Sequence, residues 1–237
     1  MILILRPEPG AASTLAAAQA GGLKALVFPL FAVRPTLWQP VARNDIDALL
    51  LGSANALRHG GTALAGYRGL PAYCVGETTA AAARAAGMEV AATGHGGLQN
   101  LLGVLQPGHS RLLRLAGRER TMLDPPARVT ITTREVYASE ALPVPAGLIE
   151  ALRAPAPQPV PAAVIALLHS GEAAARFAQI CDEAAIARGS IRLAAIGPRV
   201  AAHAGAGWAA VRSARRPDDA ALLALAQQMC QEAAYGH

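Results

Sequence analysis

The sequence has few cysteines and no long apolar run. Its three cysteines, Cys74, Cys181 and Cys230, are odd in number, far apart and each within an apolar stretch. This pattern is typical of a reduced, cytoplasmic protein, because it offers neither a disulfide framework nor a pair with metal-site spacing. The first residues, MILIL, lack a basic region and are too short for a signal peptide. No segment approaches the roughly 18 apolar residues of a membrane span, so we expect no membrane partner.

The sequence also lacks the common catalytic and cofactor motifs. It contains neither GxxxxGK(S/T) nor GxGxxG, and the GHGG at 94–97 has the wrong spacing for either. No GxSxG motif surrounds Ser53 or Ser170. The six histidines show no metal-ligand spacing, and we expect each of them to lie on the surface or in a loop. We therefore expect no cofactor and no metal.

Aromatic residues make up only 4% of the chain and charged residues 16%, against 53% hydrophobic residues. That apolar content is sufficient for buried cores and excludes a disordered chain. The net charge of +5 and the pI of about 9.6 indicate an anionic partner, unless arginine is simply the common basic residue of the source proteome. No stripe of Lys and Arg is interleaved with aromatic residues, so nucleic acid is disfavoured as the partner.

Two strand–glycine–helix junctions organise the chain. In the first, YCVGETTAAAARAAG at 73–87, a buried strand is followed by a tight turn at Gly76. Thr78 and Thr79 offer hydroxyls where a helix begins, and Gly87 is expected to cap the end of that helix.

The second junction belongs to an internal repeat with a period of about 120 residues. Residues 193–207 reproduce the strand, the turn and the helix, with the turn at Gly197 and an expected helix end at Gly207. The other matching segments are DALLLGSANAL (47–57) with VIALLHSGEAA (164–174), LQNLLGVL (98–105) with DAALLALA (219–226) and, more loosely, residues 2–8 with 112–119. Such a repeat predicts a duplicated α/β unit, and the strand–helix alternation makes each sheet mainly parallel.

The order of the matching segments predicts that the first unit is discontinuous. Residues 1–36 and 139–237 should form one α/β domain, and residues 37–138 should form the other. The chain then crosses twice between the domains, and two strands side by side at the crossings would form a hinge. The first strand, 2–5, should lie in the same sheet as 164–168.

Hydrophobic patterning predicts the remaining elements. Strands are expected at 2–5, 25–33 with a break at Pro29, 47–51, 88–92, 112–115, 129–137, 164–168, 191–196 and 208–211. Helices are expected from Ser13 or Thr14 to 21, at 55–65, 98–105, 146–153, 172–187 and 218–234, with a polar turn or short helix at 117–124 and a proline-rich connector at 154–162. The loops at Ser53, Gly76, Ser170 and Gly197 leave the carboxyl ends of strands, so we expect them to line one ligand-binding cleft.

The order of motifs resembles the uroporphyrinogen-III synthase family over almost the whole chain. The matching motifs are LRP at 5–7, LGSAN at 51–55, VGETTA at 75–80 with Gly87, GRERTML at 117–123, VY at 136–137, LHS at 168–170 and IGP at 196–198. The resemblance implies two flavodoxin-like domains joined by a two-stranded ladder, one of them discontinuous. The sequence departs from the family pattern at His169 and Val200, where Thr is common, and in its short segment 117–129.

The resemblance implies a lyase that needs no cofactor. Its substrate would be hydroxymethylbilane, a linear tetrapyrrole with eight carboxylates, which loses its terminal hydroxyl and closes to uroporphyrinogen III with inversion of ring D. The product would serve haem, sirohaem, cobalamin or chlorophyll biosynthesis. Positive charge and the N–H groups at helix starts would attract and hold the carboxylates. A monomer with a transient contact to hydroxymethylbilane synthase is expected.

The same resemblance suggests roles for individual residues. Thr79 and Tyr137 are the candidate catalytic residues, and a helix cap and a ladder aromatic in the hinge are their respective alternatives. The candidate substrate-binding residues are Arg6, Ser53, Asn55, Gly76, Thr78, Arg120, Ser170 and Gly197. Loop capping is the alternative for the serines and the asparagine, and a solvated surface position is the alternative for the arginines. A different class of protein also stays open, namely a non-catalytic two-lobed ligand-sensing or interaction module with the same fold.

Overall fold

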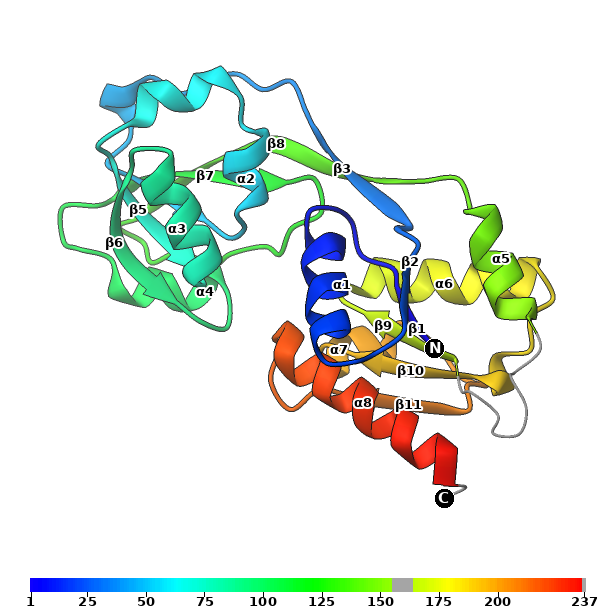
Figure 1. Cartoon of the computed structure of the whole chain (residues 1–237). Helices are drawn as coiled ribbons and strands as arrows, with labels where there is room; N and C mark the ends of the chain where they lie inside the picture. Colours follow the sequence, from blue (N-terminus) through cyan, green and yellow to red (C-terminus); the bar gives the residue numbers. More distant parts are fainter. Residues whose placement is uncertain (155–163, 236–237) are drawn as a thin grey trace. The chain divides into compact units, whose positions relative to one another are not determined.

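The computed structural model describes residues 1–154 and 164–235 (Figure 1). The chain divides into two compact units, and each is described by itself. Unit 1 comprises Met1–Ala32 and Ala141–His237, and unit 2 comprises Val33–Glu140. Both units combine helices with a mostly parallel sheet, so the predicted α/β class is confirmed. The predicted limits of independent domains, 1–36 with 139–237 and 37–138, stay a prediction.

Unit 1 is built on a five-stranded parallel sheet with the order β2-β1-β9-β10-β11. Its strands are β1 (Ile2–Ile4), β2 (Ala25–Val27), β9 (Val164–Leu168), β10 (Ile191–Ala195) and β11 (Ala210–Ser213). Numbered within the unit, this order is 2-1-3-4-5, the flavodoxin-like arrangement. The pairing of β1 with β9 confirms the prediction that 2–5 and 164–168 share a sheet.

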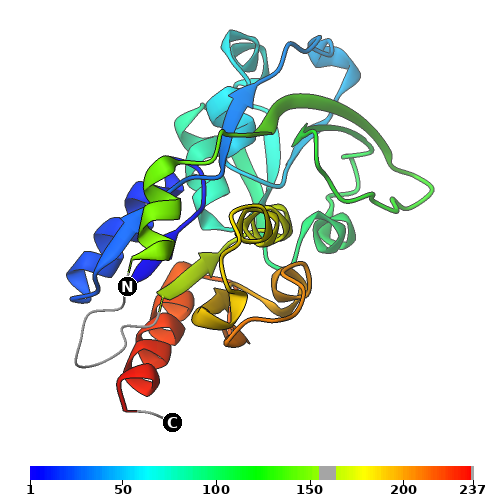
Figure 2. The same cartoon turned by 90° about the vertical axis from the view of Figure 1, so that its right-hand side faces the viewer.

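Helices cover both faces of the unit 1 sheet, which explains why its central strands are continuously apolar. Helices α1 (Gly10–Ala20) and α8 (Asp219–Tyr235) pack on one face. Helices α5 (Ala146–Arg153), α6 (Gly171–Glu183) and α7 (Pro198–Ala202) pack on the other, as Figure 2 shows for α6. A 3₁₀ turn, η4 (Arg188–Ser190), precedes β10.

The unit 2 sheet has six strands in the order β3-β8-β7-β4-β5-β6. They are β3 (Phe31–Pro35), β4 (Ala48–Leu51), β5 (Pro71–Val75), β6 (Glu89–Gly94), β7 (Arg111–Gly117) and β8 (Thr130–Ala141). The helical segments are α2 (Asn55–His59), α3 (Glu77–Ala85) and α4 (Leu98–Leu101), with 3₁₀ turns η1 (Arg43–Asp45), η2 (Thr62–Tyr67) and η3 (Leu102–Val104). Without β3, the strand order repeats that of unit 1, with β7 in the place of β1 and β8 in the place of β2.

Strand register extends this correspondence to single residues. Ile4 of β1 pairs with Leu167, and Arg114 of β7 pairs with Leu50. Leu50 and Leu167 hold the same place in the repeated segments ALLLGS and IALLHS, two residues before Gly52 and His169. Ile4 and Arg114 are therefore equivalent positions of the two sheets.

Strands β3 and β8 carry the chain between the units, and β8 is the long curved strand in Figure 2. The N–H of Thr36 donates to the carbonyl of Val136 (3.1 Å), and the N–H of Leu142 donates to the carbonyl of Leu30 (2.9 Å). The earlier residue of one strand pairs with the later residue of the other, so the two strands run antiparallel. The predicted break at Pro29 is confirmed, but the two parts of the predicted strand 25–33 are separate strands, because β2 and β3 join different sheets.

Several predicted helix limits are wrong. Helix α1 starts at Gly10, so Ser13 and Thr14 lie inside it, and α7 ends at Ala202, well before Gly207. The predicted helices at 55–65 and 98–105 are one short α-helix and one 3₁₀ turn each, and α6 ends at Glu183 rather than at 187. For 117–124, predicted as a polar turn or a short helix, the structure shows no helix. Short polar and glycine-containing segments give too little periodicity to fix such limits.

The predicted cap at Gly87 is confirmed. Gly87 has a φ of 84°, directly after α3, a left-handed conformation that favours glycine. The N–H of Gly87 donates to the carbonyl of Arg84 (2.9 Å), and the N–H of Met88 donates to the carbonyl of Ala83 (3.0 Å). This pair of bonds is the Schellman arrangement, which satisfies the last carbonyls of the helix.

Candidate functional site

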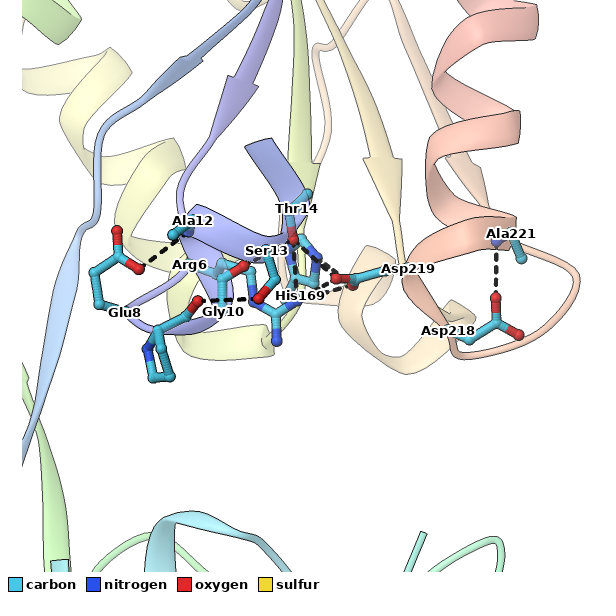
Figure 3. A network of polar contacts seen from close by, with 11 residues as sticks. Arg6, Glu8, Gly10, Ala12, Ser13, Thr14, His169, Asp218, Asp219 and Ala221 are labelled. Carbon is cyan, nitrogen blue, oxygen red and sulfur yellow. Dashed lines mark hydrogen bonds and ion pairs between the residues drawn. The ribbon is translucent and has the colours of Figure 1, made fainter. Parts of the chain in front are cut away.

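A polar network lies at the carboxyl ends of β1 and β9 in unit 1 (Figure 3). The carboxylate of Asp219, the first residue of α8, accepts hydrogen bonds from Arg6 Nη1 (2.7 and 2.8 Å), from the Thr14 hydroxyl (2.8 Å) and from His169 Nε2 (3.0 Å). Arg6 Nη1 also donates to the Thr14 hydroxyl (3.2 Å). Side chains from three segments that are distant in the sequence, residues 6–14, His169 and Asp219, therefore meet at one carboxylate.

Local structure explains why these side chains converge. Asp218 caps α8, because its Oδ1 accepts the N–H of Ala221 (2.8 Å), and this leaves Asp219 at the first turn facing β1. Arg6 lies across the start of α1, where a Cβ at Gly10 would lie 2.5 Å from Nε, so a larger residue there would displace the guanidinium. The hydrogen bond from His169, followed by those from Thr14 and the charge of Arg6, lowers the pKa of Asp219 to about 2 against the opposing effect of burial.

The network changes two interpretations of the sequence. Arg6 is not a solvated surface arginine, since its Nη1 pairs with the chain's own Asp219 and its side chain is 28% exposed. His169 lies in the loop that follows β9, one of the two places predicted for the histidines, but its side chain is only 9% exposed. Its Nδ1 is buried and has no hydrogen-bond partner among the described residues. Sequence reasoning missed Thr14 and Asp219, for which the only signal was their polar character beside apolar runs.

The other unit 1 candidates lie at helix starts. Ser170 is the N-cap of α6, and its Oγ accepts the N–H of Ala173 (3.1 Å), so the capping alternative holds for this residue. Gly197 precedes α7 in an extended conformation that any residue adopts, with φ of −172°. Its carbonyl accepts the N–H groups of Val200 and Ala201 (both 3.1 Å).

In unit 2, Ser53 lies between β4 and α2, and Asn55 is the first residue of α2. The Ser53 Oγ accepts the N–H of Asn55 (3.2 Å), and the Asn55 Oδ1 accepts from Arg58 Nη1 (3.0 Å). These are local bonds of the loop, as the capping alternative predicted, and they leave the amide nitrogen of Asn55 without a hydrogen bond among the described residues.

Gly76, Thr78 and Thr79 lie at the start of α3. Gly76 has a φ of 76° and is the N-cap residue, and neither threonine makes a side-chain capping bond. The predicted cap by Thr78 or Thr79 is therefore wrong, because the helix begins at Glu77 and Thr79 is already its third residue. Thr78 is exposed, whereas Thr79 is buried at 4% exposure.

Tyr137 lies on β8 beside the end of β7. A Cβ at Gly117 would come within 2.6 Å of the Tyr137 ring, so the glycine makes the space that the ring occupies. The ring of His59 faces it with a centroid distance of 6.2 Å, and burial lowers the pKa of His59. The Tyr137 hydroxyl has no hydrogen-bond partner among the described residues, whereas the hydroxyls of Tyr67 and Tyr73 are both hydrogen-bonded.

Two arginines lie near this end of β7. Arg120 donates from Nη1 to the carbonyls of Gly117 (3.2 Å) and Arg118 (2.9 Å), so it contacts its own loop rather than solvent alone. Arg114, which sequence reasoning missed, is buried at 7% exposure and donates from Nη1 to the carbonyl of Thr121 (2.9 Å). Its Nε is buried and has no hydrogen-bond partner in the described part of the chain. An arginine in the apolar strand LLRLA was the signal for it.

Other types of reactive site are not formed by the part of the chain that the structure describes. Within it, no three His, Cys, Asp or Glu residues are grouped so that they could hold a metal ion. The three cysteines are free thiols, and burial raises the pKa of Cys74 and Cys181 to about 11. None of the described helices has the length and apolar character needed to cross a membrane.

Comparisons with known proteins agree with this geometry. A family model described as uroporphyrinogen-III synthase HemD matches residues 13–224. The crystal structure of uroporphyrinogen-III synthetase from Helicobacter pylori has a TM-score of 0.62 at 16% identity, covering 96% of this chain and 98% of that chain. A mutant uroporphyrinogen III synthase from Thermus thermophilus has a TM-score of 0.55 at 17% identity, with 100% of both chains covered. No curated protein sequence matches the chain. At these identities the structural likeness concerns the fold.

Proposed function

The chain belongs to the uroporphyrinogen-III synthase family, and we propose which role each of its candidate residues has in that family's reaction. The protein is a lyase of tetrapyrrole biosynthesis that cyclises hydroxymethylbilane to uroporphyrinogen III, with loss of water and inversion of ring D. The family match favours this function over a non-catalytic ligand-sensing or interaction module.

The chemistry sets two tasks for the enzyme. Departure of the terminal hydroxyl gives an electrophilic, cation-like pyrrole, which the substituted position of ring D attacks, in our proposal through a spiro intermediate. Closure without control gives the symmetric type I isomer, so the enzyme must hold the chain in one conformation as well as help the hydroxyl leave. Holding requires donors for carboxylates, and departure is helped by a proton donor.

Tyr137 is our candidate for the proton donor. The observation that carries this role is its phenol, which has no partner among the described residues while the ring is held by Gly117 and His59. A phenol O–H can donate to the departing hydroxyl, and a held ring limits the positions that the donor takes. The second candidate catalytic residue, Thr79, would orient a substrate group through its hydroxyl, which forms no cap and no other hydrogen bond among the described residues.

The remaining candidates would hold carboxylates. We propose that the N–H groups that follow Gly76 at the start of α3, assisted by Thr78, bind one of them. The N–H of Arg199, the first one after Gly197 because Pro198 has none, together with Ser53, Asn55 and Ser170, would bind others. Within residues 1–154 and 164–235, Arg6 and Arg120 each bond to the chain through Nη1 alone, so we propose that their other N–H groups face the substrate.

We further propose that the enzyme acts as a monomer in the cytoplasm and takes its substrate, with eight carboxylates, through a transient contact with hydroxymethylbilane synthase. The net charge of +5 supports electrostatic attraction of such a polyanion. Substrate affinity should therefore fall as salt is raised.

The product isomer formed from freshly generated hydroxymethylbilane tests the function, since type III must exceed the type I that forms unaided. Tyr137→Phe tests the proton donor, because it keeps the ring and removes only the hydroxyl. We expect turnover to fall by roughly 10²-fold or more, as for the loss of a general acid, while type III still dominates the enzymatic product.

Tyr67→Phe is the matched control for the same chemical change in the same unit. The Tyr67 hydroxyl donates to the carbonyl of Val41 (3.0 Å) and accepts its N–H (2.9 Å), so its loss should lower stability by about 1 kcal/mol and leave turnover unchanged. If both variants keep wild-type turnover, Tyr137 is only a packing residue and the proton must come from water.

Thr79→Val tests the second catalytic candidate. Valine keeps the shape of the buried side chain and removes a hydroxyl that has no partner among the described residues, so the melting temperature should not fall. A lower turnover with an unchanged melting temperature supports a role in the reaction. Unchanged turnover removes Thr79 from the site.

A further inference from the structure

Arg114 is a buried cation without a carboxylate partner in the described part of the chain. It lies in the middle of β7, between β4 and β8, and its side chain is 93% buried, as its 7% exposure shows. One neutral acceptor, the carbonyl of Thr121, satisfies Nη1 at 2.9 Å, and the buried Nε has none. Burial and the charge of Arg120 both lower the pKa of Arg114, so its surroundings disfavour the cation that it carries.

The fold does not need an arginine here. The equivalent residue of unit 1 is Ile4, which is completely buried among apolar side chains that include Ile2 and Ile165. A sheet of the same strand order is thus built with an isoleucine at this position. A buried charge that lacks an opposite charge costs stability, and the fold gains nothing from it that Ile4 does not supply.

We propose that Arg114 is an anion-binding residue that takes one carboxylate of the substrate, an inference that rests on the proposed function for the identity of the substrate. The carboxylate would replace the Thr121 carbonyl and accept from Nε and the Nη groups, because the planar guanidinium fork matches a carboxylate with two parallel bonds.

The loop that covers Arg114 is suited to such an exchange. Residues 118–122 are exposed and contain neither helix nor strand, and the side chain of Met122 is 87% exposed. At its far end the loop is held by Gln99, which exchanges two hydrogen bonds with the backbone of Asp124 (2.8 and 2.9 Å). The Thr121 carbonyl can therefore move away from Arg114 while the end of the loop stays in place.

A simpler alternative is that Arg114 only anchors this loop through Thr121. The two roles differ in what they predict for Arg114→Ile, the substitution that copies unit 1. If Arg114 binds substrate, the variant keeps or gains thermal stability, while KM for hydroxymethylbilane rises on the order of 10- to 100-fold with little change in kcat. If Arg114 is an anchor, stability falls and KM stays the same.

Binding is also measured without turnover. A failure of the proposed synthase function can then be distinguished from a failure of the proposal for Arg114. The probe is uroporphyrin III, an inert octacarboxylate, titrated against the wild type and Arg114→Ile by fluorescence. We expect its Kd to rise by a similar factor and to depend less steeply on salt in the variant, because one ion contact is lost. An unchanged Kd overturns the proposal, whatever product the enzyme makes.

Arg111→Ile is the matched control, with the same change of charge at the other end of β7. Arg111 is 52% exposed and pairs with Asp47 (2.7 Å), so this variant should lose stability and keep KM and Kd. Arg114→Lys keeps the charge without the planar fork, and we expect its Kd to rise only a few-fold. If Arg114→Ile does not fold, Arg114→Lys decides alone. The proposal is overturned if this variant binds the probe with the wild-type Kd and is less stable than the wild type.

Discussion

The two units share a strand order but differ in where an arginine lies along the equivalent strand and in whether it is paired with a carboxylate. In unit 1, Arg6 follows β1 and is paired with Asp219 and, through it, with His169. The repeat places three uncharged residues at the equivalent positions of unit 2, namely Ala116 for Arg6, Leu98 for Asp219 and Gly52 for His169. Unit 2 instead carries its charge two residues earlier in the strand, at Arg114, where unit 1 has Ile4.

The contact between the loop after the third strand of the sheet order and the start of the last helix is present in both units, although different residue types form it. A Cβ at Gly52 would lie 3.1 Å from Leu98 Cδ1, so the loop after β4 meets the start of α4 at the place where His169 meets Asp219 in unit 1. One unit joins these elements by packing and the other by hydrogen bonds to a carboxylate. The polar network is therefore not a requirement of the fold, and the buried arginine of unit 2 is not one either.

The largest effect is expected when the arginine of unit 2 is placed in unit 1. Ile4→Arg puts a cation at a completely buried position whose apolar neighbours offer it no acceptor. We expect the free energy of unfolding to fall by about 4 kcal/mol, the cost of an uncompensated buried charge. Urea titration followed by circular dichroism measures it. A variant as stable as the wild type would show that this position tolerates charge and would weaken the comparison.

Removal of the charge at the centre of the unit 1 network should cost less. Asp219→Asn keeps the shape of the side chain and leaves Arg6 without its counter-charge. We expect the free energy of unfolding to fall by about 2 kcal/mol. This is less than for a fully buried charge, because both side chains are near one-third exposed. The triple variant Arg6→Ala, His169→Gly, Asp219→Leu copies unit 2. It should be less destabilised than the sum of its single variants, and full additivity in urea titrations would contradict the equivalence of the two contacts.

The network also predicts a pH dependence. The pKa of Asp219 is about 2 in the folded chain against an ordinary value of 3.8, so the folded state holds the carboxylate ionised more strongly than the unfolded state. This stabilisation is complete above about pH 4 and is lost as the pH falls to about 2. We expect it to contribute about 1 kcal/mol after allowance for solvent exposure.

Thermal melts between pH 2 and 5 measure this contribution. Asp47 also has a lowered pKa, through its hydrogen bonds to Arg111, and loses stabilisation over acidic pH as well. The quantity to compare is therefore the difference in melting temperature between the wild type and Asp219→Asn. This difference should shrink as the pH approaches 2. A constant difference over this range would mean that Asp219 is not the titrating group.

The smallest effects concern the two equivalent serines. Ser170 caps a helix of 13 residues, so Ser170→Ala should cost about 1 kcal/mol. Ser53 accepts only the N–H of Asn55 two residues on, and Ser53→Ala should cost a few tenths of that, roughly 0.3 kcal/mol. Equal losses in urea titrations would show that the two loops are more alike than their hydrogen bonds indicate.

Much of the fold could be predicted from the sequence, because a buried strand shows as a run of apolar residues that are adjacent in the chain. The continuous apolar runs at β1, β4 and β9 predicted the parallel sheets, and the repeat predicted the pairing of β1 with β9. Helix limits were harder, since α7 and the segment 117–124 are short and polar and their ends depend on tertiary contacts.

The candidate site was less predictable, because its groups are joined by tertiary contacts. Arg6 could be selected from its place after a strand, but Asp219 lies 213 residues away, and no local pattern links the two. Thr79 looked like a helix cap because a threonine near a helix start usually is one, and only the backbone shows that the helix begins at Glu77. The roles proposed for Tyr137 and the carboxylate-binding residues still await the experiments described above.

The interruption of unit 1 by unit 2 has a consequence for synthesis on the ribosome. Ile2 pairs with Ile165, and the core around β1 also includes Leu222 and Met229 of α8, whereas the strands β4 to β7 find their partners before residue 141. Unit 2 can fold once Glu140 has left the exit tunnel, while β1 and α1 wait for the remaining chain, roughly 5–20 s at ordinary elongation rates. During that interval β1 can pair with β2 but lacks β9 and α8, so its apolar residues stay partly uncovered and are a natural target for a chaperone. Nascent chains stalled in this window should show protease protection of unit 2 but not of unit 1.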